Sequence, residues 1–207
     1  MKNIFCLFFL AISLLACRAE KLAAVPAGSP VLVLGDSLSY GTGASAQEDY
    51  PTLLAASTGW KMINEGVPGH TSADGLARLP GLLEENAPKV LMIELGGNDF
   101  LRSVPTRETI ANLKAMIETA KAQNIAVWLV AIPEFSPVKA AFGGLTDHPL
   151  YEKLAEETGV ILIQNVFSDV LSKNSLKADQ IHPNAQGYRA VAEKMHEEFA
   201  ELGLFRR

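Results

Sequence analysis

Short apolar runs alternate with segments of helical periodicity along most of this 207-residue chain. The apolar runs are rich in β-branched residues, and they predict buried strands at residues 31–34, 61–64, 90–95, 126–132 and 160–164. The segments between them predict helices at residues 50–57, 72–85, 106–122, 150–158 and 185–204. Such alternation is typical of a parallel sheet with helices on both faces.

The number of strands narrows the fold class. We expect an α/β protein with a flavodoxin-like, three-layer α/β/α sandwich, in which a five-stranded parallel sheet has the order 2-1-3-4-5. Ligands bind such sheets beyond the carboxyl ends of the strands. Functional residues are therefore expected just after each strand and in the segment before the last helix.

Composition excludes several classes of protein. Hydrophobic residues make up 48% and charged residues 20% of the chain, which excludes a disordered, collagen-like or coiled-coil protein. The net charge is -5 and no basic block occurs, so we expect no nucleic-acid partner. The two cysteines, Cys6 and Cys17, both precede the folded body, and no His-x-x-x-His spacing occurs. No metal site is therefore expected.

The first 16 residues resemble a signal peptide. Lys2 is followed by an apolar stretch, residues 4–15, which is shorter than the roughly 20 residues of a spanning helix; a short anchor helix is the alternative. The sequence Leu14-Leu15-Ala16-Cys17 resembles a bacterial lipoprotein signal, which implies cleavage before Cys17 and lipidation of its thiol. Several acyl chains suffice for stable membrane anchoring.

This resemblance predicts a location and a domain organisation. Arg18 after Cys17 implies an outer-membrane lipoprotein of the bacterial cell envelope, whereas a soluble periplasmic or secreted product is the alternative. Residues 17–30 contain two prolines and a glycine without a strong apolar period, and we expect them to form a tether. The remaining residues, 31–207, are expected to form one domain.

Polar motifs follow the first and third predicted strands. Ser37, in Gly35-Asp36-Ser37, is expected at the start of a helical turn, where the local dipole favours a nucleophile or an oxyanion; a plain helix cap is the alternative. After the third strand, the amide of Asn98 is suited to donate a hydrogen bond to a developing negative oxygen. An Asx-turn is the alternative there.

Two further loops complete the pattern. The loop at residues 64–71 contains two glycines and a proline, and such loops can aim backbone N–H groups inward, although an ordinary turn is equally consistent. Near the C-terminus, three residues separate Asp179 from His182, a spacing that lets the carboxylate reach the imidazole Nδ1–H. A surface capping turn is the alternative reading of that motif.

Together these motifs resemble the SGNH (GDSL) hydrolases over residues 31–200, and within them the bacterial periplasmic thioesterase I, lysophospholipase and arylesterase group. The segments GDSLSYG, NEGVPGHTSADGLARLP, ELGGNDFLR and DQIHPN carry the resemblance. It implies that Ser37 is the nucleophile, that His182 is the general base, and that Asp179 orients His182. It also implies an oxyanion hole formed by the N–H groups of Ser37 and Gly69 and by the side-chain amide of Asn98.

The implied activity is hydrolysis of carboxylic esters or thioesters through an acyl-enzyme on Ser37, with no cofactor. A small-molecule or lipid ester is the expected substrate. The expected acyl-side wall includes Phe100 and Leu101, with Phe135 and Phe142 from the loop after the fourth strand, although this loop can also pack onto the sheet. A carbohydrate O-acetylesterase acting on cell-wall polymers and a non-catalytic envelope lipoprotein are the alternatives.

Overall fold

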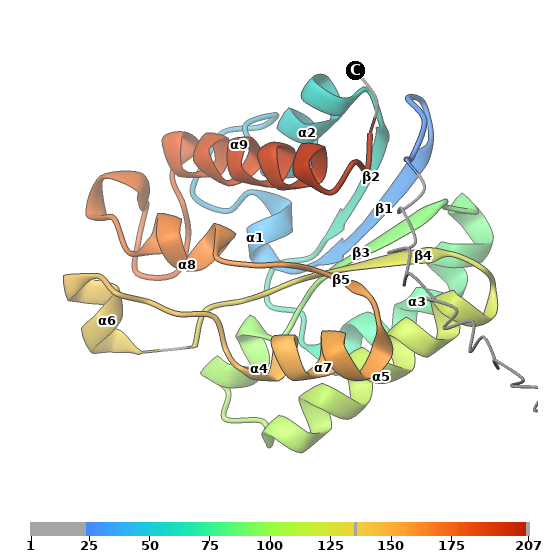
Figure 1. The fold of residues 1–207 in the computed structure, drawn as a ribbon. Helices are drawn as coiled ribbons and strands as arrows, with labels where there is room; N and C mark the ends of the chain where they lie inside the picture. The colour runs from blue at the N-terminus through green and yellow to red at the C-terminus, as the bar shows by residue number, and fades with distance from the viewer. Residues whose placement is uncertain (1–23, 135, 206–207) are drawn as a thin grey trace, which may run out of the picture.

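A five-stranded parallel sheet forms the centre of the computed structural model, which describes residues 24–134 and 136–205. The strand order is β2-β1-β3-β4-β5, which confirms the predicted α/β class and topology (Figure 1). The strands are β1 (Pro30–Gly35), β2 (Lys61–Gly66), β3 (Val90–Glu94), β4 (Ala126–Val130) and β5 (Ile161–Ile163).

Helices cover both faces of this sheet, which confirms the three-layer arrangement (Figure 1). One layer contains α3 (Ser72–Asn86), α4 (Gly97–Leu101), α5 (Thr106–Ala122) and α7 (Leu150–Thr158). The opposite layer contains α1 (Ser37–Tyr40), α2 (Tyr50–Thr58), α8 (Val166–Leu171) and α9 (Ala185–Glu201). A 3-10 turn, η1 (Asn174–Leu176), precedes α9, and α6 (Pro137–Phe142) projects beyond β4.

Several local features differ from the sequence prediction. The last helix ends at Glu201 because Gly203 has a φ of 70°, and Leu204 and Phe205 then turn back onto the core. The helices α4, α6 and α8 were not predicted, since five or six residues are too few to display a helical period.

The central strands β1 and β3 are the most deeply buried part of the core, because strands flank them on both sides and helices cover both faces. An aromatic cluster extends this core toward α9. The ring centroids of Trp60 and Trp128 are 5.1 Å apart, and those of Trp128 and Phe199 are 4.9 Å apart. These contacts attach α9, which follows the Asp179–His182 segment, to the sheet.

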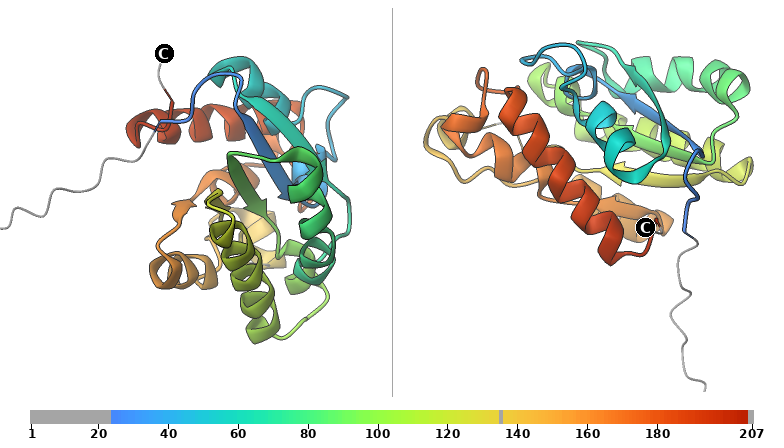
Figure 2. Two further views of the ribbon diagram at one scale, coloured as in Figure 1. Left: turned by 90° about the vertical axis from the view of Figure 1, so that its right-hand side faces the viewer. Right: turned by 90° about the horizontal axis from the view of Figure 1, so that it is seen from above.

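The chain before β1 packs against the domain from Val25 onward. Val25 is buried and donates its N–H to the Leu204 carbonyl at 2.6 Å, while Trp60 Nε1 donates to the Val25 carbonyl at 3.0 Å. Both views in Figure 2 show the first described residues beside the end of the chain. The predicted tether at 17–30 is therefore wrong for residues 24–30, because Val25 finds an apolar site beside Trp60.

The remaining part of the predicted tether, the signal peptide at 1–16 and Cys17 lie outside the described residues. Within the part of the chain that the structure describes, no helix has the length and apolar character needed to cross a bilayer.

Candidate active site

The turn after β1 presents Ser37 at the carboxyl end of the sheet. Asp36 caps α1, and its Oδ1 accepts a hydrogen bond from the Leu38 N–H at 2.9 Å. Ser37 is the first residue of α1. Gly35 is required before this turn, since a Cβ there would lie 2.0 Å from Ser39 Oγ.

The segment between η1 and α9 brings a histidine to Ser37. His182 Nε2 lies 3.0 Å from Ser37 Oγ, and His182 Nδ1 lies 2.7 Å from Asp179 Oδ2. The other oxygen of Asp179 accepts the N–H groups of Ile181 and His182, both at 2.8 Å. Ser37, His182 and Asp179 thus form one hydrogen-bonded chain, the arrangement that activates a serine hydroxyl.

The side chains of His182 and Asp179 differ in their exposure to solvent. The side chain of His182 is 14% exposed, whereas that of Asp179 is 55% exposed. Partial burial alone would raise the pKa of Asp179, but hydrogen bonds from the His182 side chain and from the N–H groups of Ile181 and His182 lower it. Asp179 is therefore ionised at neutral pH and can stabilise a positive charge on His182.

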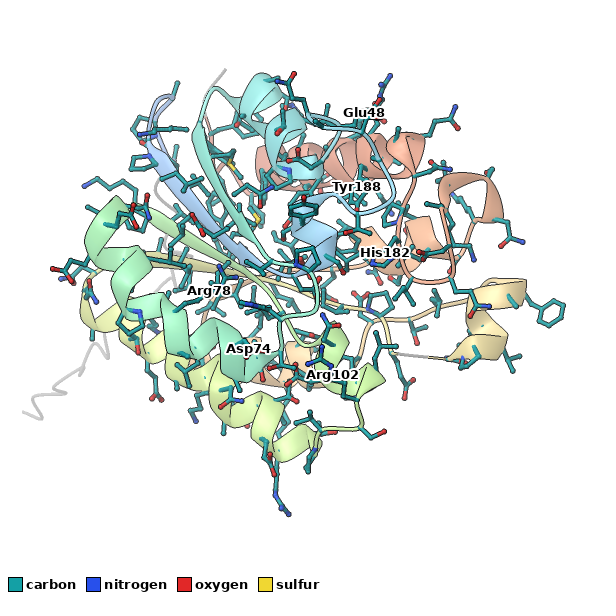
Figure 3. The ribbon with its side chains drawn as sticks, turned by 180° about the vertical axis from the view of Figure 1, so that it is seen from behind. Glu48, Asp74, Arg78, Arg102, His182 and Tyr188 are labelled. Atoms are coloured by element: carbon teal, nitrogen blue, oxygen red, sulfur yellow. The ribbon has the colours of Figure 1, made fainter. Side chains whose placement is uncertain are left out.

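Gly69 lies in a tight turn after β2. The His70 N–H donates to the Val67 carbonyl at 3.1 Å, and Gly69 has a φ of 83°. With Pro68 before Gly69, these features are typical of a type II turn, whose own hydrogen bond leaves the Gly69 N–H unused. Arg102 Nη2 donates to the Gly69 carbonyl at 2.8 Å (the position of Arg102 is labelled in Figure 3).

Asn98 connects this turn to the turn that carries Ser37. Its Nδ2 group donates to Asp36 Oδ2 at 2.9 Å and to the His70 carbonyl at 3.0 Å. The adjacent Asp99 is buried and accepts hydrogen bonds from Ser72 and Thr109, so α4 is held against α3 and α5. Asn98 is thereby oriented by its own partners in two segments and by the anchoring of Asp99 beside it.

Asp36 itself is almost completely buried. This burial raises its pKa to about 6, although the Leu38 N–H, the charge of His182 and the Asn98 amide oppose the shift. The hydrogen bonds of Asp36 join the turn that carries Ser37 to Asn98. It acts as a structural link between the two turns.

A pocket that is partly open to solvent adjoins Ser37. Its polar wall includes Ser37, Asn98 and His182, whereas Gly69 is not among the lining residues. Most other lining residues are apolar: Leu38, Phe100, Leu101, Ile132, Pro133, Leu145, Leu171 and Ile181. Such a lining suits an acyl chain or an aryl group better than a sugar.

Only some of the residues predicted for the acyl-side wall line the pocket. Phe100 and Leu101 line the pocket, and the Phe100 ring stacks on His148 with the centroids 4.4 Å apart. Phe142 does not line it: its side chain is 89% exposed, so this prediction is wrong. The physical reason is that α6, which ends at Phe142, projects away from the sheet (Figure 1). Phe135 lies outside the described residues.

Sequence reasoning missed three residues of the apolar wall, Leu38, Leu171 and Ile181. Ile181 lies directly before His182, so the motif itself contained the signal. No comparable signal pointed to Leu171, which belongs to the unpredicted helix α8.

Figure 3 shows His182 and Tyr188 close to the α1 turn. Tyr188 is buried in α9 and donates its hydroxyl to the Thr42 carbonyl at 2.8 Å, which anchors the segment after Ser37. Across residues 24–134 and 136–205, no group of three or more His, Cys, Asp or Glu side chains is arranged to hold a metal ion.

Comparison with known proteins agrees with this site. Residues 33–190 match the model of the GDSL-like lipase/acylhydrolase family. The chain is 34% identical over 202 residues to thioesterase 1/protease 1/lysophospholipase L1 of Escherichia coli K12, covering 94% of this chain and 91% of the relative. It is 32% identical over 187 residues to an arylesterase of Vibrio mimicus, covering 86% and 92%.

Solved structures extend the similarity to three dimensions. The esterase EstA from Pseudoalteromonas sp., in a structure inhibited by monoethylphosphonate, has a TM-score of 0.72 and 28% identity. The match covers 84% of this chain and 97% of EstA. The chain therefore belongs to the GDSL-like lipase/acylhydrolase family and is a carboxylic ester hydrolase.

Proposed function

We propose that the protein hydrolyses acyl esters or thioesters through an acyl-enzyme on Ser37. This proposal rests mainly on the series of hydrogen bonds from Asp179 through His182 to Ser37, which ends at an apolar pocket. As Ser37 Oγ attacks the substrate carbonyl carbon, His182 Nε2 takes the hydroxyl proton. His182 then gives this proton to the departing alkoxide or thiolate, so the alcohol or thiol leaves.

The second half of the reaction releases the acid. Water gives a proton to His182 and attacks the ester carbonyl, and the proton returns to Ser37 Oγ as the carboxylic acid departs. In both halves, negative charge develops on the carbonyl oxygen. The N–H groups of Ser37 and Gly69 and the Asn98 amide are the proposed donors to this oxygen. Asn98 would then exchange one of its present partners, Asp36 or His70, for the oxyanion.

The apolar wall supports a fatty acyl, aryl or short acyl ester as substrate. The relatives are named thioesterase, lysophospholipase and arylesterase, which supports the same range of substrates. The EstA structure inhibited by monoethylphosphonate supports the use of phosphonates as probes of the present protein. The protein is accordingly expected to react with such phosphonates at Ser37.

The proposed location is the bacterial cell envelope, with Cys17 as the lipid-carrying residue of an outer-membrane lipoprotein. The N-terminal sequence supports this assignment. Mass spectrometry of the protein from a bacterial membrane fraction tests it: an acylated N-terminal Cys17 is expected. A Cys17→Ala variant that still fractionates with the membrane would contradict it.

The function is tested with p-nitrophenyl esters from acetate to palmitate, using residues 18–207 and the Ser37→Ala variant. We expect Ser37-dependent activity with a preference for medium or long chains. Activity on acetate alone would favour a cell-wall O-acetylesterase. A folded protein with no activity on any chain length would instead favour a non-catalytic lipoprotein.

A further inference from the structure

A carboxyl group that the proposed mechanism does not use lies beneath the nucleophile turn. Glu94 is the last residue of β3, its exposure is 0%, and it pairs in the sheet with Gly35 of β1. A buried carboxyl has a large desolvation cost unless hydrogen bonds compensate it. The partners of Glu94 therefore indicate what it does.

One oxygen of Glu94 contacts the backbone on both sides of Ser37. Oε2 accepts the Ser39 N–H at 3.0 Å and, in a longer contact, the Asp36 N–H at 3.4 Å. The Ser39 hydroxyl also donates to Oε2, at 2.6 Å. Ser39 and Asp36 flank the nucleophile, so this single atom restrains the turn that carries it.

The network continues into α2. Ser39 Oγ lies 2.8 Å from the Tyr50 hydroxyl, and Tyr50 is fully buried at the start of that helix. A Cβ at Gly35 would lie 2.8 Å from Glu94 Oε2 and closer still to Ser39 Oγ, so these polar groups fill the space behind the turn. Among the described residues, the other oxygen, Glu94 Oε1, has no hydrogen-bond partner.

The property of Glu94 that restrains the turn is its hydrogen-bond acceptor oxygen rather than a negative charge. Burial, and then the charge of Asp36, raise the pKa of Glu94 well above its ordinary value. The carboxyl thus resists ionisation. A glutamine with its amide oxygen at the Oε2 position would accept the same N–H and O–H groups.

We propose that Glu94 is a positioning residue for Ser37: it fixes the backbone before and after the nucleophile, and Ser39 and Tyr50 hold its acceptor oxygen in place. This inference rests on the proposed function. Removal of the acceptor would let the α1 turn shift relative to His182, and a displacement of about 1 Å in such a site can cost about 100-fold in rate. Binding of the acyl chain, which uses apolar lining residues from several segments of the pocket, would change little.

The test compares Glu94→Ala with Glu94→Gln in steady-state kinetics on p-nitrophenyl butyrate. For Glu94→Ala we expect kcat to fall about 100-fold while KM changes by less than about threefold. Glu94→Gln should restore kcat to within about fivefold of the wild type. Leu113→Ala, a core truncation in α5 away from the turn, is the control for loss of stability and should keep its kcat while it remains folded.

A folded Glu94→Ala variant with kcat within about threefold of the wild type would overturn the proposal. So would a folded Glu94→Gln variant as slow as Glu94→Ala, because the acceptor would then not be what matters. If Glu94→Ala does not fold, Ser39→Ala carries the test: a lower kcat at unchanged KM supports the proposal, and an unchanged kcat overturns it. Ser37→Ala in the same assay distinguishes failure of the proposed function from failure of the proposed role of Glu94. Activity without Ser37 would refute the proposed function, whatever the effect of the Glu94 variants.

Discussion

The two walls of the pocket are built in contrasting ways. On the polar wall, Ser37, Asn98 and His182 are each oriented by partners at hydrogen-bond distance. On the apolar wall, Phe100, Ile132 and Leu171 line the pocket. The nearby helix α6 stays outside it, and its residues Val138 and Phe142 are 68% and 89% exposed. In the proposed mechanism, directional hydrogen bonds would set the geometry of bond breaking, whereas non-directional apolar contacts would select the acyl group.

The largest effect should come from the polar wall. Ser37→Ala removes the nucleophile and should reduce kcat by about 10⁴-fold or more. The measurement is hydrolysis of p-nitrophenyl butyrate at enzyme concentrations high enough to detect the residual rate. Ser57→Ala, a change at an exposed serine of α2, is the matched control. A comparable loss in that control would point to a general effect of handling or folding.

Asp179→Asn should reduce kcat by about 1,000-fold, because an amide cannot stabilise the imidazolium and favours the wrong tautomer of His182. The fold should be unaffected, since the Asp179 side chain is more than half exposed. Kinetics and thermal unfolding on the same preparation check both statements. A variant that retains a tenth of the wild-type kcat would show that His182 is oriented by its backbone contacts alone.

Asn98→Ala should reduce kcat by about 100-fold, the usual cost of one oxyanion donor. A phosphonate that mimics the tetrahedral intermediate would lose the same donor, so its affinity should fall together with kcat. The variant also deprives Asp36 Oδ2 of a hydrogen-bond donor. Inactivation rates with such a phosphonate provide the readout. Unchanged inactivation at reduced kcat would argue against a role in oxyanion binding.

The apolar wall should respond in chain-length preference rather than in chemistry. Phe100→Ala should lower kcat/KM for long-chain esters by about tenfold relative to acetate, because Phe100 lines the pocket. Phe142→Ala is the matched control and should leave all chain lengths within about twofold. The opposite pattern would mean that α6 closes over the pocket when substrate binds.

The smallest effect concerns a carboxyl outside both walls. Burial first, and then the charges of Glu201 and Asp147, raise the pKa of Glu198 to about 7. The folded protein therefore binds this proton more tightly than the unfolded chain, so stability falls as pH rises from about 4.5 to 7. Glu198→Gln should abolish that part of the pH dependence.

Solvent screens the half-exposed carboxylate of Glu198 and reduces the effect of its pKa shift on stability. We therefore expect the Glu198→Gln variant to be more stable than the wild type by about 1 kcal/mol at pH 8.5, and equally stable near pH 4. Thermal unfolding at both pH values is the measurement, and kcat should not change. Equal stability at pH 8.5 would show that solvent screens the carboxylate fully.

Most of the fold and much of the site could be predicted because the relevant signals are local. A buried parallel strand such as β3 is a continuous apolar run, and the helices between strands keep a 3.6-residue period. The spacing of Asp179 and His182 is likewise local, and the structure closes the predicted contact at 2.7 Å. The predictions failed where local composition was the only guide, at residues 24–30 and at Phe142.

The sequence by itself determined which residue types follow each strand, since parallel strands deliver their carboxyl ends to one rim. Only the tertiary structure decided which of those side chains enter the pocket and which buried groups support them. Glu94 and Ser39 are 55 positions apart, yet they meet because β1 and β3 are neighbours in the sheet. Burial and hydrogen bonding between distant segments depend on how the layers pack, and no local period encodes that packing.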